Sequence, residues 1–170
     1  MEVEQLTRRL AEGAAAIGAL VQGLTDDQVR WKPDPDSWSV LEVVCHPLDE
    51  ERAAFRVRLE ITLHRPGEPW PGIDPGGWVT AREYNKQDLA ATLAAFVQER
   101  EASLAWLRGL PPPDWAAAYA APWGGPIRAG DLMAAWVAHD LLHTRQLVEL
   151  RWALTRAELE PYSVEYAGKW

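Results

Sequence analysis

The chain has 170 residues, of which 48% are hydrophobic and 25% charged, and this composition fits one globular domain with one core. Its net charge of −8 argues against a broad nucleic-acid-binding surface, and no apolar run is long enough to span a membrane. A single cysteine excludes an intrachain disulfide, so we expect one cytoplasmic domain over residues 1–170 without nucleic-acid or membrane partners.

The first half of the chain predicts two helices. Apolar residues at steps of three and four favour an amphipathic helix over residues 2–23. A stretch rich in Asp, Pro and Ser follows, and it predicts a loop. Ser39 and Glu42 then have the spacing of a capping box, in which each side chain binds a backbone N–H of the first turn. We therefore expect the second helix over residues 40–63.

The second half predicts two more helices. Thr80 and Glu83 repeat the capping-box spacing, so we expect the third helical region over residues 80–108. Asp131 is a candidate N-cap for a fourth helix over residues 132–154. The sequence shows no convincing strand alternation, and the segments between the helices are long. These patterns predict an all-α fold, a four-helix bundle with long connecting loops.

Histidines are the candidate metal ligands. His139 and His143 are four residues apart, so they lie on one helix face, one turn apart, and can bind one ion. A divalent site normally needs a third protein ligand, which His46 or His64 could supply. These two lie about 27 Å apart along a helix and cannot both serve one site. His64 lies at a predicted helix end and is expected at the surface, whereas His46 could reach the pair if the two helices pack in a suitable register, which the sequence alone does not establish.

Other interpretations of the histidines remain open at this point. The pair could be two core residues, since this spacing is not rare in helices. It could be part of a zinc-protease motif, H-E-x-x-H, but Asp140 stands where that motif has its glutamate base. A nucleophilic pair of Cys45 and His46 is disfavoured, because adjacent residues on a helix point about 100° apart. We expect Cys45 to be a small core residue.

Two sequence blocks together resemble the DinB-like superfamily, four-helix-bundle proteins also described as DinB/YfiT-like metalloenzymes. The first is "DSWSVLEVVCHPLDEE" and the second is "GDLMAAWVAHDLLHTRQL". The matching positions are Trp38, Ser39, Glu42 and His46 in the first block, and His139 and His143 in the second. Pro47 departs from the family pattern, because a proline inside a helix removes one hydrogen bond and favours a kink that could re-aim His46.

The resemblance implies a divalent ion, typically nickel, zinc or manganese, held by His46, His139 and His143. It also implies an enzyme acting on a small molecule, either a hydrolase or a transferase that uses a low-molecular-weight thiol. Glu50, one turn from His46, is the candidate catalytic base or ligand-orienting group, although it could instead pair with an arginine. The alternative function is a non-catalytic bundle that binds a metal or small ligand. A homodimer is expected in either case.

Several neighbours of the histidines also have predicted places. Gln146 is expected beside His143 or at the edge of the pocket, whereas Asp140 and Arg145 are expected at the surface. Trp136 is expected to line the cavity, and Trp38 or Trp31 to cover its mouth. The chain has ten tryptophans, most of them in or beside the predicted loops, where they either pin the loops to the bundle or line a pocket.

Overall fold

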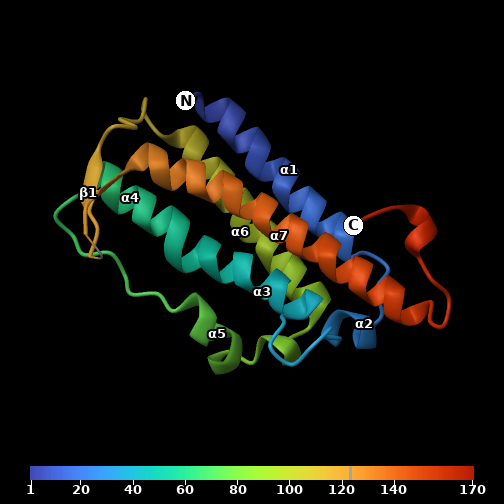
Figure 1. The fold of residues 1–170 in the computed structure, drawn as a ribbon. Coiled ribbons are helices and arrows are strands. Elements are labelled where there is room, and N and C mark those ends of the chain that lie inside the picture. Colours follow the sequence, from blue (N-terminus) through green and yellow to red (C-terminus); the bar gives the residue numbers. More distant parts are fainter. Residues whose placement is uncertain (123) are drawn as a thin grey trace.

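Four long helical segments form the bundle seen in Figure 1, which confirms the predicted all-α architecture. This computed structural model describes residues 1–122 and 124–170, so the loop tryptophan Trp123 lies outside the described residues. The elements in chain order are α1 (Val3–Val21), α2 (Asp26–Arg30), α3 (Val40–Glu50), the π-helix η1 (Glu51–Phe55), α4 (Arg56–His64), α5 (Pro75–Ala81), the 3-10 helix η2 (Tyr84–Lys86), α6 (Leu89–Gly109), β1 (Ala118–Ala120), β2 (Pro126–Arg128), α7 (Ala129–Glu158) and the 3-10 helix η3 (Glu165–Ala167).

The helices pack so that α1 and α3 each contact both α6 and α7. α3 also contacts α5, and the β1–β2 hairpin contacts α4 and α7 at the far end of the bundle from α2 (Figure 1). Buried apolar residues form one cluster around Ile17, Val43 and Phe96, and a second around Leu10, Leu59 and Met133. The core therefore runs the length of the bundle, and α3 and α7 lie side by side within it.

The second predicted helix is present but changes its winding one turn after Pro47. Its start at Val40 agrees with the prediction, because the Ser39 side chain accepts from Glu42 N–H while the Glu42 carboxylate accepts from Ser39 N–H. The α-helix continues through Pro47 to Glu50 and then widens into η1 before α4 begins. The irregularity expected from the proline is therefore a π-helical segment rather than a break.

The third helical region begins later than predicted. Thr80 lies in the short helix α5, whose N-cap is Asp74, and Glu83 has a left-handed backbone with φ 49°. The long helix α6 starts after Asp88, whose carboxylate accepts a hydrogen bond of 2.7 Å from a backbone N–H of the first turn. The prediction was wrong here because Asp88 caps the apolar run directly, whereas the Thr80 spacing occurs at a helix end.

The fourth helix is longer than predicted, and short strands precede it. α7 starts at Ala129 instead of residue 132, and Asp131 lies in its first turn, where its carboxylate accepts from Arg128 N–H at 3.1 Å. The hairpin pairs Tyr119 with Ile127 in antiparallel register. Strands of three residues are too short to show the alternation that would have predicted them.

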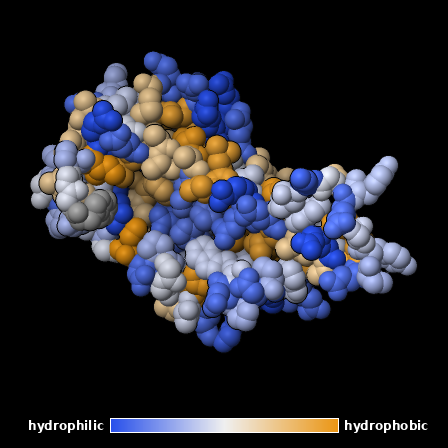
Figure 2. Space-filling view, in the orientation of Figure 1, coloured by the Kyte–Doolittle hydropathy of each residue, from blue (hydrophilic) through white to orange (hydrophobic). Residues whose placement is uncertain are grey.

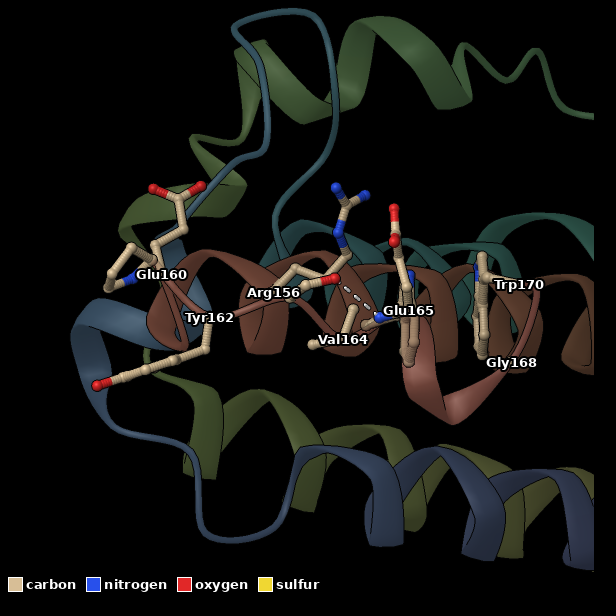
Figure 3. Close-up of a pocket in the computed structure, with 10 residues that line it drawn as sticks. Arg156, Glu160, Tyr162, Val164, Glu165, Gly168 and Trp170 are labelled. Carbon is tan, nitrogen blue, oxygen red and sulfur yellow. Dashed lines mark hydrogen bonds between the residues drawn. The ribbon is translucent and has the colours of Figure 1, made fainter.

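After α7 the chain folds back along this helix. The rings of Trp152 and Trp170 stack with centroids 4.7 Å apart. This tail encloses a pocket of about 470 Å³, whose lining includes Arg156 and Glu165 (Figure 3). On the face shown in Figure 2, hydrophobic residues gather over the first half of α7 and hydrophilic residues border them. None of the described helices is long and apolar enough to cross a membrane.

Candidate metal centre

Three histidine side chains from two helices converge at the middle of the bundle. His46 comes from α3, whereas His139 and His143 come from successive turns of α7. Nε2 of His139 lies 3.2 Å from Nε2 of His46 and 3.1 Å from Nε2 of His143. One ligand nitrogen from each ring lies within 4.8 Å of the other two. Pro47 therefore leaves His46 within reach of the α7 pair.

These distances fit a shared ion better than hydrogen bonds between the rings. In a tetrahedral site with metal–nitrogen bonds of roughly 2.0–2.1 Å, two ligand nitrogens lie about 3.3 Å apart. Each imidazole nitrogen carries either one proton or one lone pair, so Nε2 of His139 can form only one of its two short contacts as a hydrogen bond. A cation between the three lone pairs satisfies all of them, and the donor set fits a divalent ion.

Aromatic rings and apolar packing enclose the three histidines. The ring of Trp38 lies 5.2 Å from that of His46, and the edge of Phe55 faces His139 at 5.0 Å between centroids. His46 is 6% exposed and His143 is 8% exposed, so most of each residue's surface is covered by protein. Such a setting strengthens electrostatic interactions between the site and any charged group bound there.

Burial keeps the imidazoles in the neutral form that binds metals. Burial, together with nearby His143, lowers the pKa of His46 to about 4. Burial also lowers the pKa of His139 to about 3, with further contributions from His143, His46 and Arg100. The pKa of His143 is lowered as well, again by burial. The lone pairs that a cation needs are therefore available at neutral pH.

A pocket opens beside the histidines. Its volume is about 620 Å³, and its lining includes Trp38, His143 and Gln146. Oε1 of Gln146 lies 3.0 Å from Nδ1 of His143, so Gln146 occupies the place predicted for it. Trp38 also stands where the sequence predicted a cover. A small molecule in this pocket would reach the cluster through His143.

Glu50 is buried, but it does not join the three ligand nitrogens. Its side chain is 6% exposed, and its Oε1 has no hydrogen-bond partner within the described part of the chain. Burial raises the pKa of this carboxyl group, while the charge of Arg58 acts in the opposite direction. Nδ1 of His46, one helical turn away, is likewise buried without a partner among the described residues.

Comparison with known proteins places this arrangement in a family. The sequence profile of the DinB superfamily matches residues 9–147. The chain belongs to the DinB superfamily. Among solved structures, YfiT from Bacillus subtilis superposes with a TM-score of 0.80 at 20% identity, over 91% of this chain and 88% of YfiT. YfiT is described as a probable metal-dependent hydrolase with an unusual four-helix bundle topology. No curated protein sequence matches the chain.

Beside its histidines, this DinB-superfamily bundle holds a buried charge network that the sequence did not predict. Arg100 of α6 donates to both oxygens of Glu51 at 3.0 Å, and to the Asp140 oxygens at 2.5 and 3.0 Å. It also donates to the backbone carbonyl of Leu10 in α1 at 2.6 Å. At Gly13 a Cβ would lie 2.3 Å from Asp140 Oδ2, so the close approach of α1 requires glycine there. The sequence did contain one sign of this network: Arg100 lies on the same apolar face of its helix as Phe96 and Leu104.

Two predictions about neighbouring side chains were therefore wrong. Asp140 is 2% exposed and ion-paired, rather than at the surface, because the arginine that balances it comes from another helix. Trp136 is 1% exposed and belongs to the core, where it stacks on Phe55 and donates to Glu51 Oε2 at 3.0 Å. Phe55, on which Trp136 stacks, makes a ring contact with His139. Arg145 is exposed, as predicted.

The protease and cysteine-nucleophile interpretations gain no support. His64 is exposed at the end of α4, as predicted. Asp140 is bound to Arg100 and cannot serve as a protease base. Cys45 is 3% exposed within the core, and burial raises the pKa of its thiol to about 11, which disfavours the reactive thiolate.

Proposed function

We propose that this protein is a metal-dependent hydrolase that acts on a small molecule and holds one divalent ion between Nε2 of His46, His139 and His143. The observation that carries the proposal is the convergence of three neutral imidazoles next to an open pocket. The fold shared with YfiT, a probable metal-dependent hydrolase, supports the same reaction class. Three neutral ligands leave coordination positions for water or substrate, as in catalytic rather than structural sites.

Residues of the chain orient the ligands, limit the access of water and hold the substrate near the ion. When bound, a divalent ion polarises a carbonyl oxygen and lowers the pKa of water toward about 7, which supplies a nucleophile at neutral pH. Gln146 orients His143, while Trp38 and Phe55 limit the access of bulk water. The pocket lined by Trp38 and His143 holds the substrate against the cluster.

Glu50 is the proposed acid–base or orienting group. Its carboxylate lies one helical turn from His46, and its burial without a hydrogen-bond partner in the described chain raises its pKa. A raised pKa suits a group that takes up and returns a proton near neutral pH. If Glu50 instead orients His46 through the unpartnered Nδ1, it fixes which nitrogen faces the ion. Both roles are consistent with the position of Glu50, and they predict different effects of replacing it.

Nickel, zinc and manganese are the proposed ions. Imidazole ligands suit zinc and nickel well, whereas manganese prefers sites with more oxygen ligands. Three histidines with an open position are a known zinc arrangement. We therefore rank zinc and nickel ahead of manganese for this site.

Elemental analysis tests the proposal directly. Protein without a tag, purified without chelators, should carry about one divalent ion per chain. The double variant His139→Ala/His143→Ala should carry none, and the variant His64→Ala, which changes an exposed histidine, should keep the ion. An ion retained by the double variant, or no ion in the unaltered protein after metal loading, would show that the proposed centre is wrong.

Two further expectations from the sequence depend on the same centre. Transfer to or from a low-molecular-weight thiol would use the ion to bind a thiolate, and it predicts turnover of a simple electrophile only when such a thiol is present. A protein that binds the ion but turns over neither esters, amides nor thiol–electrophile pairs would be the non-catalytic bundle. The homodimer stays a prediction, which light scattering of the purified protein would check.

A further inference from the structure

The pocket beside the histidines has a charge of its own. Its lining includes the carboxylates of Asp36, in the loop before α3, and of Glu149, in α7. Among the residues that the structure describes, no Lys or Arg lines this pocket. The remaining walls include the Trp38 ring and the apolar side chain of Leu150. The ionised groups that face a bound molecule are therefore negative.

Two basic side chains that lie next to lining residues in the sequence, Arg145 and Lys32, leave this charge in place. Arg145 approaches Glu149 at 3.5 Å, but its side chain is 71% exposed, and an exposed pair of this kind is weak and screened by solvent. Lys32 is paired with the buried carboxylate of Glu42 at 2.9 Å, and neither residue lines the pocket. For Asp36, no ion pair is found within the described residues.

The acidic lining is not a general property of the pockets along α7. The tail pocket on the same helix is lined by Arg156 as well as by Glu160 and Glu165 (Figure 3). Its charges are therefore mixed, and none of the three histidines belongs to it. The pocket that contacts His143 combines two carboxylate residues with Trp38 and borders the three-histidine cluster.

We propose that the substrate carries a cationic amine, which Asp36 and Glu149 bind while the reacting group lies at the three histidines. This inference rests on the proposed metal-dependent function and adds the charge of its substrate. Trp38 lines the same pocket, so an ammonium group bound there would lie beside an aromatic ring, a contact that further stabilises cations. The net charge of −8 also attracts cations toward the protein before they bind.

Three hydroxamates of matched length test the charge preference on the metal-loaded protein. A hydroxamate group binds divalent ions, and the far end is an ammonium in 6-aminohexanohydroxamic acid, a methyl in heptanohydroxamic acid and a carboxylate in adipic acid monohydroxamate. Calorimetric titration should give the tightest binding for the ammonium compound. We expect the methyl compound to bind about tenfold more weakly, and the carboxylate compound more weakly still.

Variants separate this inference from the proposed function. Asp36→Asn combined with Glu149→Gln should remove the preference for the ammonium compound while keeping the bound ion. Glu12→Gln is the matched control, because Glu12 is also an exposed carboxylate paired with an arginine four residues away, but on α1. Equal affinities for the three compounds, or a preference that survives the double variant, would overturn the amine proposal alone. Failure of all three to bind protein that holds its ion would overturn the open metal site and the amine proposal together.

Discussion

The amide oxygen of Gln146, about one helical turn after His143 in α7, lies 3.0 Å from Nδ1 of His143. The oxygen can only accept, so the proton of the neutral imidazole resides on Nδ1 and the lone pair on Nε2. Nε2 is the atom that lies 3.1 Å from His139. One amide outside the cluster therefore sets the direction in which His143 presents its lone pair.

Replacing Gln146 should weaken ion binding without unfolding the protein. Gln146→Met removes the acceptor and keeps a side chain of similar length, so we expect ion affinity to fall at least about tenfold. Gln146→Glu restores an acceptor and should recover most of the affinity. Competition with a chromophoric chelator measures both variants. Unchanged affinity in Gln146→Met would show that the hydrogen bond does not orient His143.

Glu50→Gln distinguishes the two roles proposed for this carboxylate. If Glu50 moves a proton, the variant should keep its ion, while kcat for a substrate found by screening falls roughly 10²–10⁴-fold. If Glu50 orients His46, ion affinity should fall first, and turnover should recover at saturating metal. Elemental analysis and kinetics on the same preparation measure both effects. A variant with unaltered affinity and unaltered kcat would remove Glu50 from the site.

Arg100→Met should strongly destabilise the bundle. The substitution leaves the carboxylates of Glu51 and Asp140 buried without their cation, and breaking a buried ion pair in this way costs roughly 3–5 kcal/mol. Urea unfolding followed by circular dichroism measures the loss. Arg145→Met is the control, since its exposed ion pair should contribute less than about 1 kcal/mol. Similar losses in the two variants would contradict the central role of Arg100.

The metal-free protein should lose stability as the pH falls from 7.5 toward 5. The pKa values of His46 and His139 drop from the ordinary histidine value of 6.5 to about 4 and about 3 in the folded chain. At pH values between the folded-state and the ordinary pKa, the unfolded chain binds more protons than the folded chain. The free energy of unfolding therefore rises with pH in this range. For His46, the stabilisation by the neutral imidazole is complete above pH 6.5 and is lost as the pH falls through 4. It amounts to at most about 3–4 kcal/mol.

Urea unfolding at several pH values measures this dependence. Glu50 acts in the opposite sense, because burial raises its pKa, so the slope should be steeper in Glu50→Gln. His64→Gln, which replaces an exposed histidine at the end of α4 and outside the cluster, is the control variant. A free energy of unfolding that stays constant between pH 7.5 and 5.5 would contradict neutral, buried imidazoles.

Local signals in the sequence predicted much of the fold. The capping box at Ser39 and Glu42 determined the start of the second helix correctly, because both partners of a cap lie within one turn. The same spacing at Thr80 and Glu83 gave a wrong start for the third helix, because a short helix ends there and Asp88 caps the long helix instead. The π-helical winding at Glu51–Phe55 could not be read from the residues, although Pro47 marked the region as irregular.

The candidate site was predictable only in part, for a similar reason. His139 and His143 share a helix face by spacing alone, and the family resemblance added His46 to them. The place of Asp140 depends on Arg100, which is 40 residues away in the chain, and no local pattern reports such a pairing. The pocket also combines residues from the loop before α3 and from α7, so it required the folded arrangement.

The guanidinium group of Arg100 contacts every long segment of the bundle, through Leu10 in α1, Glu51 in η1 and Asp140 in α7, while Arg100 itself belongs to α6. Detaching any one segment would leave buried charges or a buried carbonyl without a partner. The helices should therefore open together rather than fray apart one by one. In hydrogen exchange, the slowest amides of α1, α3, α6 and α7 should share one protection free energy, equal to that of global unfolding.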